Sequence, residues 1–266
     1  MNKLIKMAFA AISCLAFTQC SDFLDTSSPS NIDDEFVSSS PTETLKILSR
    51  GYALYRESCF GAYNWNDHFG SDIEYFPENN SSNNINAKLV PEQIPCDYMK
   101  DPFNSLYSVI AYTTKAINLI SEKTQYKEDI AAGRTTDWTH FKGEAETFRA
   151  MCYFDLIKHF GDVPYGYENS YVDDYEITSR FAIYDKLIEA VKAVEPYMYK
   201  VGEGGINGQR ISRTFANALI GKMALYAGGY QTIRTDMPEL YGEVQFEVLR
   251  TCLLYTSPSP RDVEES

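Results

Sequence analysis

The segment from Lys142 to Pro164, KGEAETFRAMCYFDLIKHFGDVP, constrains the fold more than any other part of the chain. Apolar residues recur along it every three or four positions, which is the spacing of one helical face. That face carries Phe141, Ala145, Phe148, Cys152 and Leu156. A second apolar face carries Met151, Tyr153, Phe154, Ile157 and Phe160, so we expect a helix that is covered on two sides. The helix should stop at Gly161-Asp162-Val163-Pro164, because glycine tolerates a left-handed turn and proline cannot continue a helix.

Other segments show the same helical periodicity. One begins at Ser40-Pro41-Thr42-Glu43, where a serine N-cap, a proline in the first helical position and a glutamate reaching back form a capping box. Another restarts at Asp101-Pro102 and runs to Ile120, before a polar connector over 122–137. A third follows Thr178-Ser179 and should bury Ile183, Leu187, Val191, Val194 and Met198.

The last clear helix is capped by Ser212 and ends at Gly228-Gly229. Its small residues should allow close helix–helix contact; they are Ala216, Ala218, Gly221, Ala224 and Ala227. No run of alternating β-branched residues is long enough to predict a substantial sheet. The chain is therefore predicted to be all-α, with antiparallel helix pairs joined by variable loops.

The longest helix also carries a recognisable motif. GEA, then Arg149-Ala150, Tyr153-Phe154 and a closing FGDVP, resembles the signature of the RagB/SusD family of outer-membrane glycan-binding lipoproteins. The segment GQRISRTFANALIGKMALYAG resembles the family helix that follows the signature loop. DPFNSLYSVIAYTTKAINLI resembles an earlier family helix, with Phe103 where members often carry tryptophan.

The resemblance implies a tetratricopeptide-like scaffold of antiparallel helix pairs with long aromatic-rich loops. It also implies a cell-surface protein that binds oligosaccharides and delivers them to a TonB-dependent, SusC-like transporter in the outer membrane, by binding and not by catalysis. Family members are considerably longer, so the likeness covers their N-terminal part. Two alternatives remain at this point: a peptide-binding member of the same family, or an exported all-α hydrolase with its catalytic residues in the missing half.

The N-terminus has the features of a lipoprotein signal. Lys3 and Lys6 precede an apolar run over 7–17 that is too short to cross a bilayer. We expect residues 1–19 to be a signal peptide and Cys20 to carry the lipid anchor, with palmitate-like acyl chains holding the protein on the outer membrane. Cys14 fits the preceding small residues better but leaves a shorter apolar core; an ordinary secretory signal is a further alternative. Residues 20–39 are a polar tether.

The C-terminal residues 252–266 are expected to be non-native. CLLYTSPSPRD, from Cys252 onward, follows no helical period and resembles one reading frame of the transposase adapter used in sequencing libraries. A Ser/Pro-rich tail is the alternative. On this interpretation the helical domain covers residues 40–251 and is the N-terminal part of a longer protein.

The net charge of the chain and the absence of several catalytic and ligand-binding motifs limit the possible functions. A net charge of −13 argues against nucleic acid and against electrostatic docking on anionic lipid. His68, His140 and His159 are dispersed without metal-ligand spacing, and the glycine-rich turn over 202–208 lacks the Gly-Lys-Ser/Thr of a phosphate loop. Acid pairs such as Glu144 and Glu146 are expected on solvated surfaces. We therefore predict no catalytic site, no metal and no cofactor.

The candidate ligand contacts lie in the loop FGAYNWNDHFGSDIEYF, from Phe60 to Phe76. Aromatic rings beside amides and carboxylates are what a pyranose needs, with stacking for its C–H face and hydrogen bonds for its hydroxyls. The predicted contacts are Tyr63, Asn64, Trp65, Asp67, Asp72 and Tyr75, with Trp65 foremost. The alternative is a loop whose rings pack on the helices. Cys59 and Cys96 flank this region and can be paired or free, whereas Cys152 is expected in the core.

Overall fold

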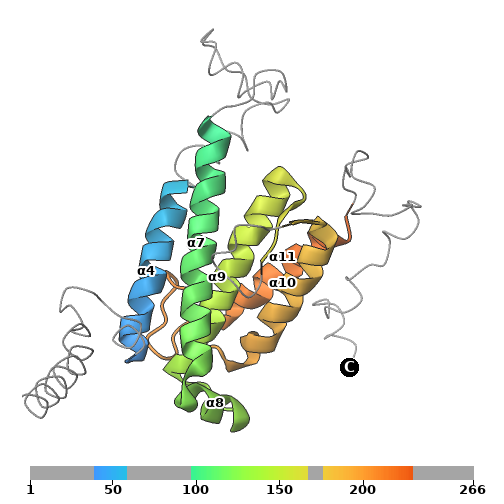
Figure 1. Ribbon diagram of the computed structural model, residues 1–266. Coiled ribbons are helices and arrows are strands. Elements are labelled where there is room, and N and C mark those ends of the chain that lie inside the picture. Colours follow the sequence, from blue (N-terminus) through green and yellow to red (C-terminus); the bar gives the residue numbers. More distant parts are fainter. Residues whose placement is uncertain (1–38, 59–96, 167–175, 230–266) are drawn as a thin grey trace, which may run out of the picture. The chain divides into compact units, whose positions relative to one another are not determined.

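The computed structural model describes residues 39–58, 97–166 and 176–229, and these form a helical bundle (Figure 1). The helices are α4 (Pro41–Ser58), α7 (Asp97–Glu122), α8 (Thr124–Ala131), α9 (Asp137–Phe160), α10 (Arg180–Val194), the 3-10 turn η3 (Glu195–Tyr197) and α11 (Arg213–Ala227). The two-residue strands β1 (Val163–Pro164) and β2 (Ile177–Thr178) pair antiparallel, Val163 opposite Thr178. The all-α prediction is confirmed. Within the described ranges, no helix is long and apolar enough to span a bilayer.

Side-chain caps fix the starts of several helices, as local sequence predicts. The Ser40 hydroxyl accepts a bond from the Glu43 backbone amide at 3.2 Å, and the Ser212 hydroxyl accepts one from Phe215 at 3.3 Å. The Glu43 carboxylate, which we expected to bond back to Ser40, pairs with Lys46 at 2.6 Å. Helix α9 begins earlier than the signature motif, at a capping box in which Thr136 and Thr139 bond reciprocally.

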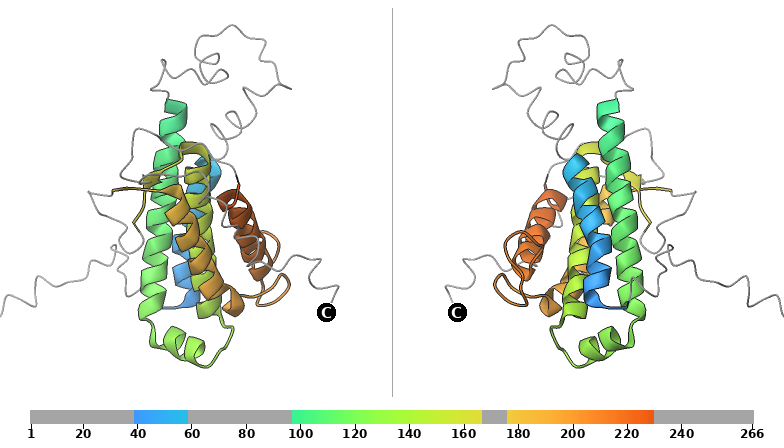
Figure 2. Two further views of the ribbon diagram at one scale, coloured as in Figure 1. Left: turned by 90° about the vertical axis from the view of Figure 1, so that its right-hand side faces the viewer. Right: turned by 90° about the vertical axis from the view of Figure 1, so that its left-hand side faces the viewer.

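Helix α9 is the central element of the bundle. It packs against α7 and α10 along its length, and α4 and α11 also contact it (Figures 1 and 2). Contacts between α7 and α9 join Phe103 to Phe160 near one end and Ser121 to Lys142 near the other, so the two helices are antiparallel. Helices α9 and α10 are antiparallel as well, and so are α10 and α11. This is the arrangement expected of a tetratricopeptide-like scaffold.

Both predicted apolar faces of α9 are covered. Phe148, Cys152 and Leu156 on the first face are fully buried, and on the second face Tyr153, Phe154 and Ile157 are 2% exposed. The inward residues predicted for α10 are buried too: Ile183, Leu187, Val191, Val194 and Met198. Cys152 is fully buried, in agreement with its expected place in the core.

Three local expectations are wrong. Helix α7 begins at Asp97 and contains Pro102, whereas the sequence pattern placed its start at Asp101. The supposed polar connector contains α8. Ala218 is exposed on α11, where its small side chain had suggested a helix contact. The signal segment, the tether and the tail lie outside the described residues, so those boundaries stay predictions.

Candidate functional site

The ends of several helices meet at one end of the bundle, the upper end in Figure 1. Tyr55, in the last turn of α4, donates to Asp155 of α9 at 2.7 Å. Phe103, near the start of α7, lies edge-on to Phe160 at the end of α9, with ring centroids 5.1 Å apart. Segment 59–96 joins α4 to α7, so both of its attachment points are at this end. We call this region the aromatic end.

Aromatic rings in tilted and edge-on contact build the aromatic end, and they come from α7, α9 and the segment that follows α9. The Tyr107 ring lies 4.9 Å from that of Phe103 and perpendicular to that of Tyr153, and the Tyr107 hydroxyl donates to the Pro164 carbonyl at 2.6 Å. Tyr153 also contacts Tyr165, with centroids 4.8 Å apart. Phe103, Tyr107 and Tyr165 are only partly buried, so this cluster has rings at the surface. Such partly exposed rings can carry an apolar ligand face.

An ion pair closes the short hairpin beside these rings. The Asp162 carboxylate accepts from the Arg180 backbone amide at 3.0 Å and from Arg180 Nε at 3.2 Å. Gly161 has a φ of 78°, and a Cβ on it would lie 2.5 Å from Arg180 Nη2, so this position requires glycine. The predicted helix stop at Gly161 is confirmed. The same pair joins the residue before β1 to the first residue of α10, beside the pairing of β1 with β2.

Asp155, in the second half of α9, has a clearly perturbed pKa. Burial raises the pKa of its carboxyl above the usual value, and the hydrogen bond from Tyr55 partly opposes that shift. A raised pKa in an acid is one mark of a functional group. Here the hydroxyl of Tyr55 donates to one carboxylate oxygen, and the pair joins α4 to α9.

The signature acids lie in the core, which corrects the expectation of solvated surfaces. Glu144 is fully buried; its Oε1 accepts from the Tyr52 hydroxyl at 2.7 Å and from Arg210 Nε at 3.1 Å, and its Oε2 pairs with Arg210 Nη2. Burial, with Glu144 nearby, raises the pKa of Tyr52. His140 lies beside this pair, and burial followed by the Arg210 charge lowers its pKa to about 4.

A second buried group of charges connects α9 to α7. Glu146 Oε2 accepts from Arg149 Nη2 at 2.6 Å, and its Oε1 accepts from Lys142 Nζ at 3.3 Å. Lys142 also donates to Ser121 at 2.8 Å, and Arg149 reaches Thr114 at 3.4 Å. Burial lowers the pKa of Lys142. The polar signature residues therefore hold helices together. Helical spacing brings Glu146 next to Lys142 and Arg149, whereas no spacing rule couples Glu144 to Arg210.

None of the predicted ligand contacts falls on described residues. Tyr63, Asn64, Trp65, Asp67, Asp72 and Tyr75 lie in segment 59–96, and the proposed anchor Cys20 lies in segment 1–38. The structure instead supplies the frame to which segment 59–96 attaches, at Ser58 and Asp97. Across the described ranges, no group of His, Cys, Asp and Glu side chains could hold a metal ion.

Comparison with known proteins identifies relatives of this scaffold. A SusD-like family model, described as "Starch-binding associating with outer membrane", matches residues 22–195. A SusD-like carbohydrate-binding protein from Bacteroides fragilis aligns with a TM-score of 0.54 at 18% identity, over 71% of this chain and 37% of that protein. A SusD homologue from Bacteroides thetaiotaomicron aligns with a TM-score of 0.55 at 18% identity, over 82% and 41%. A search of curated proteins found no match.

Proposed function

The chain belongs to the SusD-like family of starch-binding proteins that associate with the outer membrane, and we propose that it binds oligosaccharides at the aromatic end of the bundle. The family match over residues 22–195 carries this proposal. The family description names binding and no reaction, in agreement with the expectation of a binding protein and not an enzyme. The chain spans well under half the length of the solved relatives, 37% and 41%, so its substrate and partners are part of the proposal.

The proposed contacts combine ring stacking with polar recognition. Trp65, Tyr63 and Tyr75 would stack on sugar faces, while Asn64, Asp67 and Asp72 would bond to hydroxyls. The partly exposed rings of Phe103 and Tyr107 support this site, because they lie where α7 begins, next to the attachment of segment 59–96. The helices beneath are fixed by buried ion pairs, which is what a rigid platform for variable loops requires.

The second part of the proposal concerns location and delivery. The lipoprotein-like signal and Cys20 would place the protein on the outer membrane as an acylated, surface-exposed protein. There it would hand oligosaccharides to a SusC-like, TonB-dependent transporter in the same membrane. The family description, which names association with the outer membrane, supports the location. The transporter partner rests on the resemblance alone.

The contact proposal is tested by comparing the chain's two tryptophans. Trp65→Ala should weaken affinity for a maltooligosaccharide by about tenfold, since a stacked ring contributes about 1–2 kcal/mol. Trp138→Ala is the matched control, because Trp138 lies in the first turn of α9 at the opposite end of that helix. Isothermal titration calorimetry gives the affinities, and a thermal unfolding midpoint reports folding.

The outcomes separate the alternatives. Equal affinities of Trp65→Ala and the unchanged protein, with equal midpoints, would remove Trp65 from the site. A lowered thermal unfolding midpoint for Trp65→Ala would show that the Trp65 ring packs on the helices. If maltooligosaccharides do not bind, a glycan array extends the search to other sugars, and binding of peptides without any glycan would contradict the proposed ligand class.

A further inference from the structure

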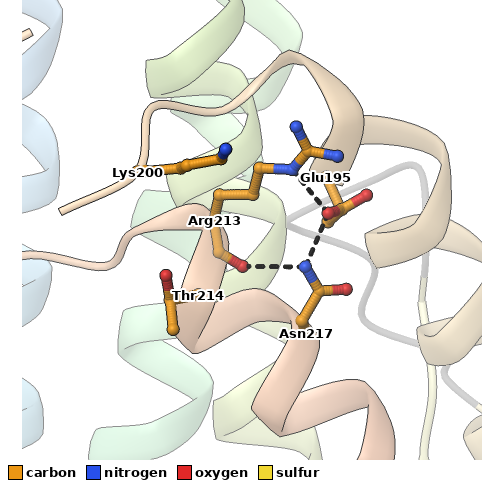
Figure 3. Close-up of a pocket in the computed structure, with 5 residues that line it drawn as sticks. All are labelled: Glu195, Lys200, Arg213, Thr214 and Asn217. Atoms are coloured by element: carbon orange, nitrogen blue, oxygen red, sulfur yellow. Dashed lines mark hydrogen bonds and ion pairs between the residues drawn. The ribbon is translucent and has the colours of Figure 1, made fainter. Parts of the chain in front are cut away.

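A polar pocket lies at the end of the bundle opposite the aromatic end, between η3 and the first turn of α11. It has a volume of about 370 Å³ and is lined by Glu195, Lys200, Arg213, Thr214 and Asn217. Figure 3 shows the side chains of Lys200 and Arg213 on the same side of this pocket, with Glu195 and Asn217 joined to Arg213 by hydrogen bonds. The volume is within the range of small-molecule sites, roughly 300–1,000 Å³.

The charged acceptor in this pocket, Glu195, is bonded through one of its two carboxylate oxygens. Glu195 Oε1 accepts from Arg213 Nε at 2.7 Å and from Asn217 Nδ2 at 2.6 Å. The start of α11 is capped as well, since the Arg213 amide donates to the Tyr199 carbonyl at 2.9 Å. The Glu195 charge is therefore paired, and it positions the Arg213 guanidinium at the pocket wall.

The unpaired groups of the pocket include three sets of donors, beside the acceptor oxygens Glu195 Oε2 and Asn217 Oδ1. Among the described residues, no side chain pairs with the Lys200 ammonium, with the terminal nitrogens of Arg213 or with the Thr214 hydroxyl. Two cations face one carboxylate, so the pocket is locally positive in a chain whose net charge is −13. Glu203 accepts from the Lys200 backbone amide at 3.0 Å but does not line the pocket. A ligand that pairs with these donors presents acceptor atoms and negative charge.

We propose that this pocket binds the oxyanion of an acidic sugar residue, with Lys200 and Arg213 pairing with the charge and Thr214 donating to a further oxygen. The oxyanion can be a uronate carboxylate or a sulfate ester, because both offer oxygens for the same donors. The statement that a sugar carries this oxyanion rests on the proposed function. The statement that the pocket binds an oxyanion does not. The lining contains no aromatic side chain, so charge and not stacking gives this pocket its selectivity.

Glucuronate and glucose are the matched probes, because they differ in the carboxylate. Titration of the whole chain at low salt should show binding of glucuronate and much weaker binding of glucose. Lys200→Gln removes an exposed, unpaired charge and should weaken glucuronate binding about fivefold. Thr214→Val removes the hydroxyl and should weaken it about threefold. Lys192→Gln removes an exposed charge from the last turn of α10 and should leave affinity unchanged.

Each result has a defined meaning. Three results would overturn the proposed oxyanion site. They are equal affinity for glucose and glucuronate, no binding of glucuronate, and equal losses of affinity in Lys200→Gln and Lys192→Gln. Competition by inorganic sulfate would assign the affinity to the oxyanion in general, whereas glucuronate binding without such competition would assign it to a carboxylate. If Trp65→Ala weakens maltooligosaccharide binding while Lys200→Gln leaves glucuronate binding unchanged, this inference fails and the proposed function stands.

Discussion

His140 is a buried side chain whose hydrogen bond defines its proton position. Its Nδ1 accepts from the Tyr199 backbone amide at 3.1 Å, so the proton of the neutral ring is on Nε2. Nε2 lies 3.8 Å from Glu144 Oε2 and is otherwise without a hydrogen-bond partner in the part of the chain that the structure describes. Burial disfavours the imidazolium, and the Arg210 charge adds to this. The folded protein therefore holds a neutral histidine.

This neutral state predicts a loss of stability in mild acid. The pKa of His140 is about 4 in the folded state against 6.5 for an unperturbed histidine, so between these values the unfolded chain binds more protons. The free energy of unfolding should fall as the pH drops from 6.5 towards 4, by up to about 1.4 kcal/mol per pH unit. The raised pKa of Asp155 acts in the opposite direction above pH 3.8.

His140→Asn tests that assignment, because an asparagine oxygen can accept from Tyr199 but does not titrate. Urea unfolding at about pH 4.5 and about pH 7 should show a smaller difference in this variant than in the unchanged protein. An equal pH dependence in the variant and in the unchanged protein would contradict a neutral His140.

At the scale of elements, Gly143 determines how closely η3 and the residue after it approach α9. A Cβ at this position would overlap Met198 Cγ and lie 2.7 Å from its Sδ. Met198 is 2% exposed, so its side chain has little room to move. The GEA motif thus needs glycine for packing, although glycine in a helix interior is locally unfavourable.

Gly143→Ala should lower the free energy of unfolding by about 1–3 kcal/mol, the usual range for overpacking. Gly221→Ala is the matched control within a helix, because nothing lies within 4 Å of a Cβ there. It should raise stability by up to about 1 kcal/mol, from helix propensity. Denaturant unfolding gives both values. In a Met198→Ala background the Gly143→Ala loss should shrink, and an undiminished loss would rule out this contact.

Periodicity predicted the helices that bury apolar faces and missed the one that does not. Phe148 and Leu187 recur with their neighbours at helical spacing, so α9 and α10 were predictable. Helix α8 buries Asp129 and no apolar residue. Its contacts are polar: Asp129 accepts from Gln125, Arg134 and Thr136, and the Thr136 bond is the first cause of its lowered pKa. The prediction for Ala218 was wrong because a small side chain is equally compatible with a helix–helix contact and with an exposed surface.

At the scale of the molecule, the sequence predicted the family and the scaffold but not the long-range charge pairing in the core. Glu144 and Arg210 are far apart in the chain, and no spacing rule couples them. The predicted contacts around Trp65 stay predictions, since they lie outside the described residues. What the structure adds is the shared location of Ser58 and Asp97, which follows from the antiparallel packing of α4 and α7.

Membrane attachment is the prediction that concerns the whole protein. Cys20→Ser should abolish incorporation of labelled palmitate in cells and release the protein from the membrane fraction, because the acyl chains supply the attachment. Cys14→Ser is the control and should keep both the label and the location. The reverse pattern, with label lost only in Cys14→Ser, would move the anchor to that residue; label retained in both variants would contradict lipidation at either cysteine.

The buried carboxylate of Glu144 has a consequence for local unfolding. It is bonded to Tyr52, 92 positions earlier, and to Arg210, 66 positions later. If α4 alone detached, the carboxylate would lose the hydroxyl that helps solvate it inside the protein, which costs about 1–3 kcal/mol for a buried polar group. Detachment of α4 is therefore coupled to loosening of the contacts that Glu144 makes on α9. Residues 52, 144 and 210 then belong to one cooperative unit, and partial detachment at one site weakens the other two.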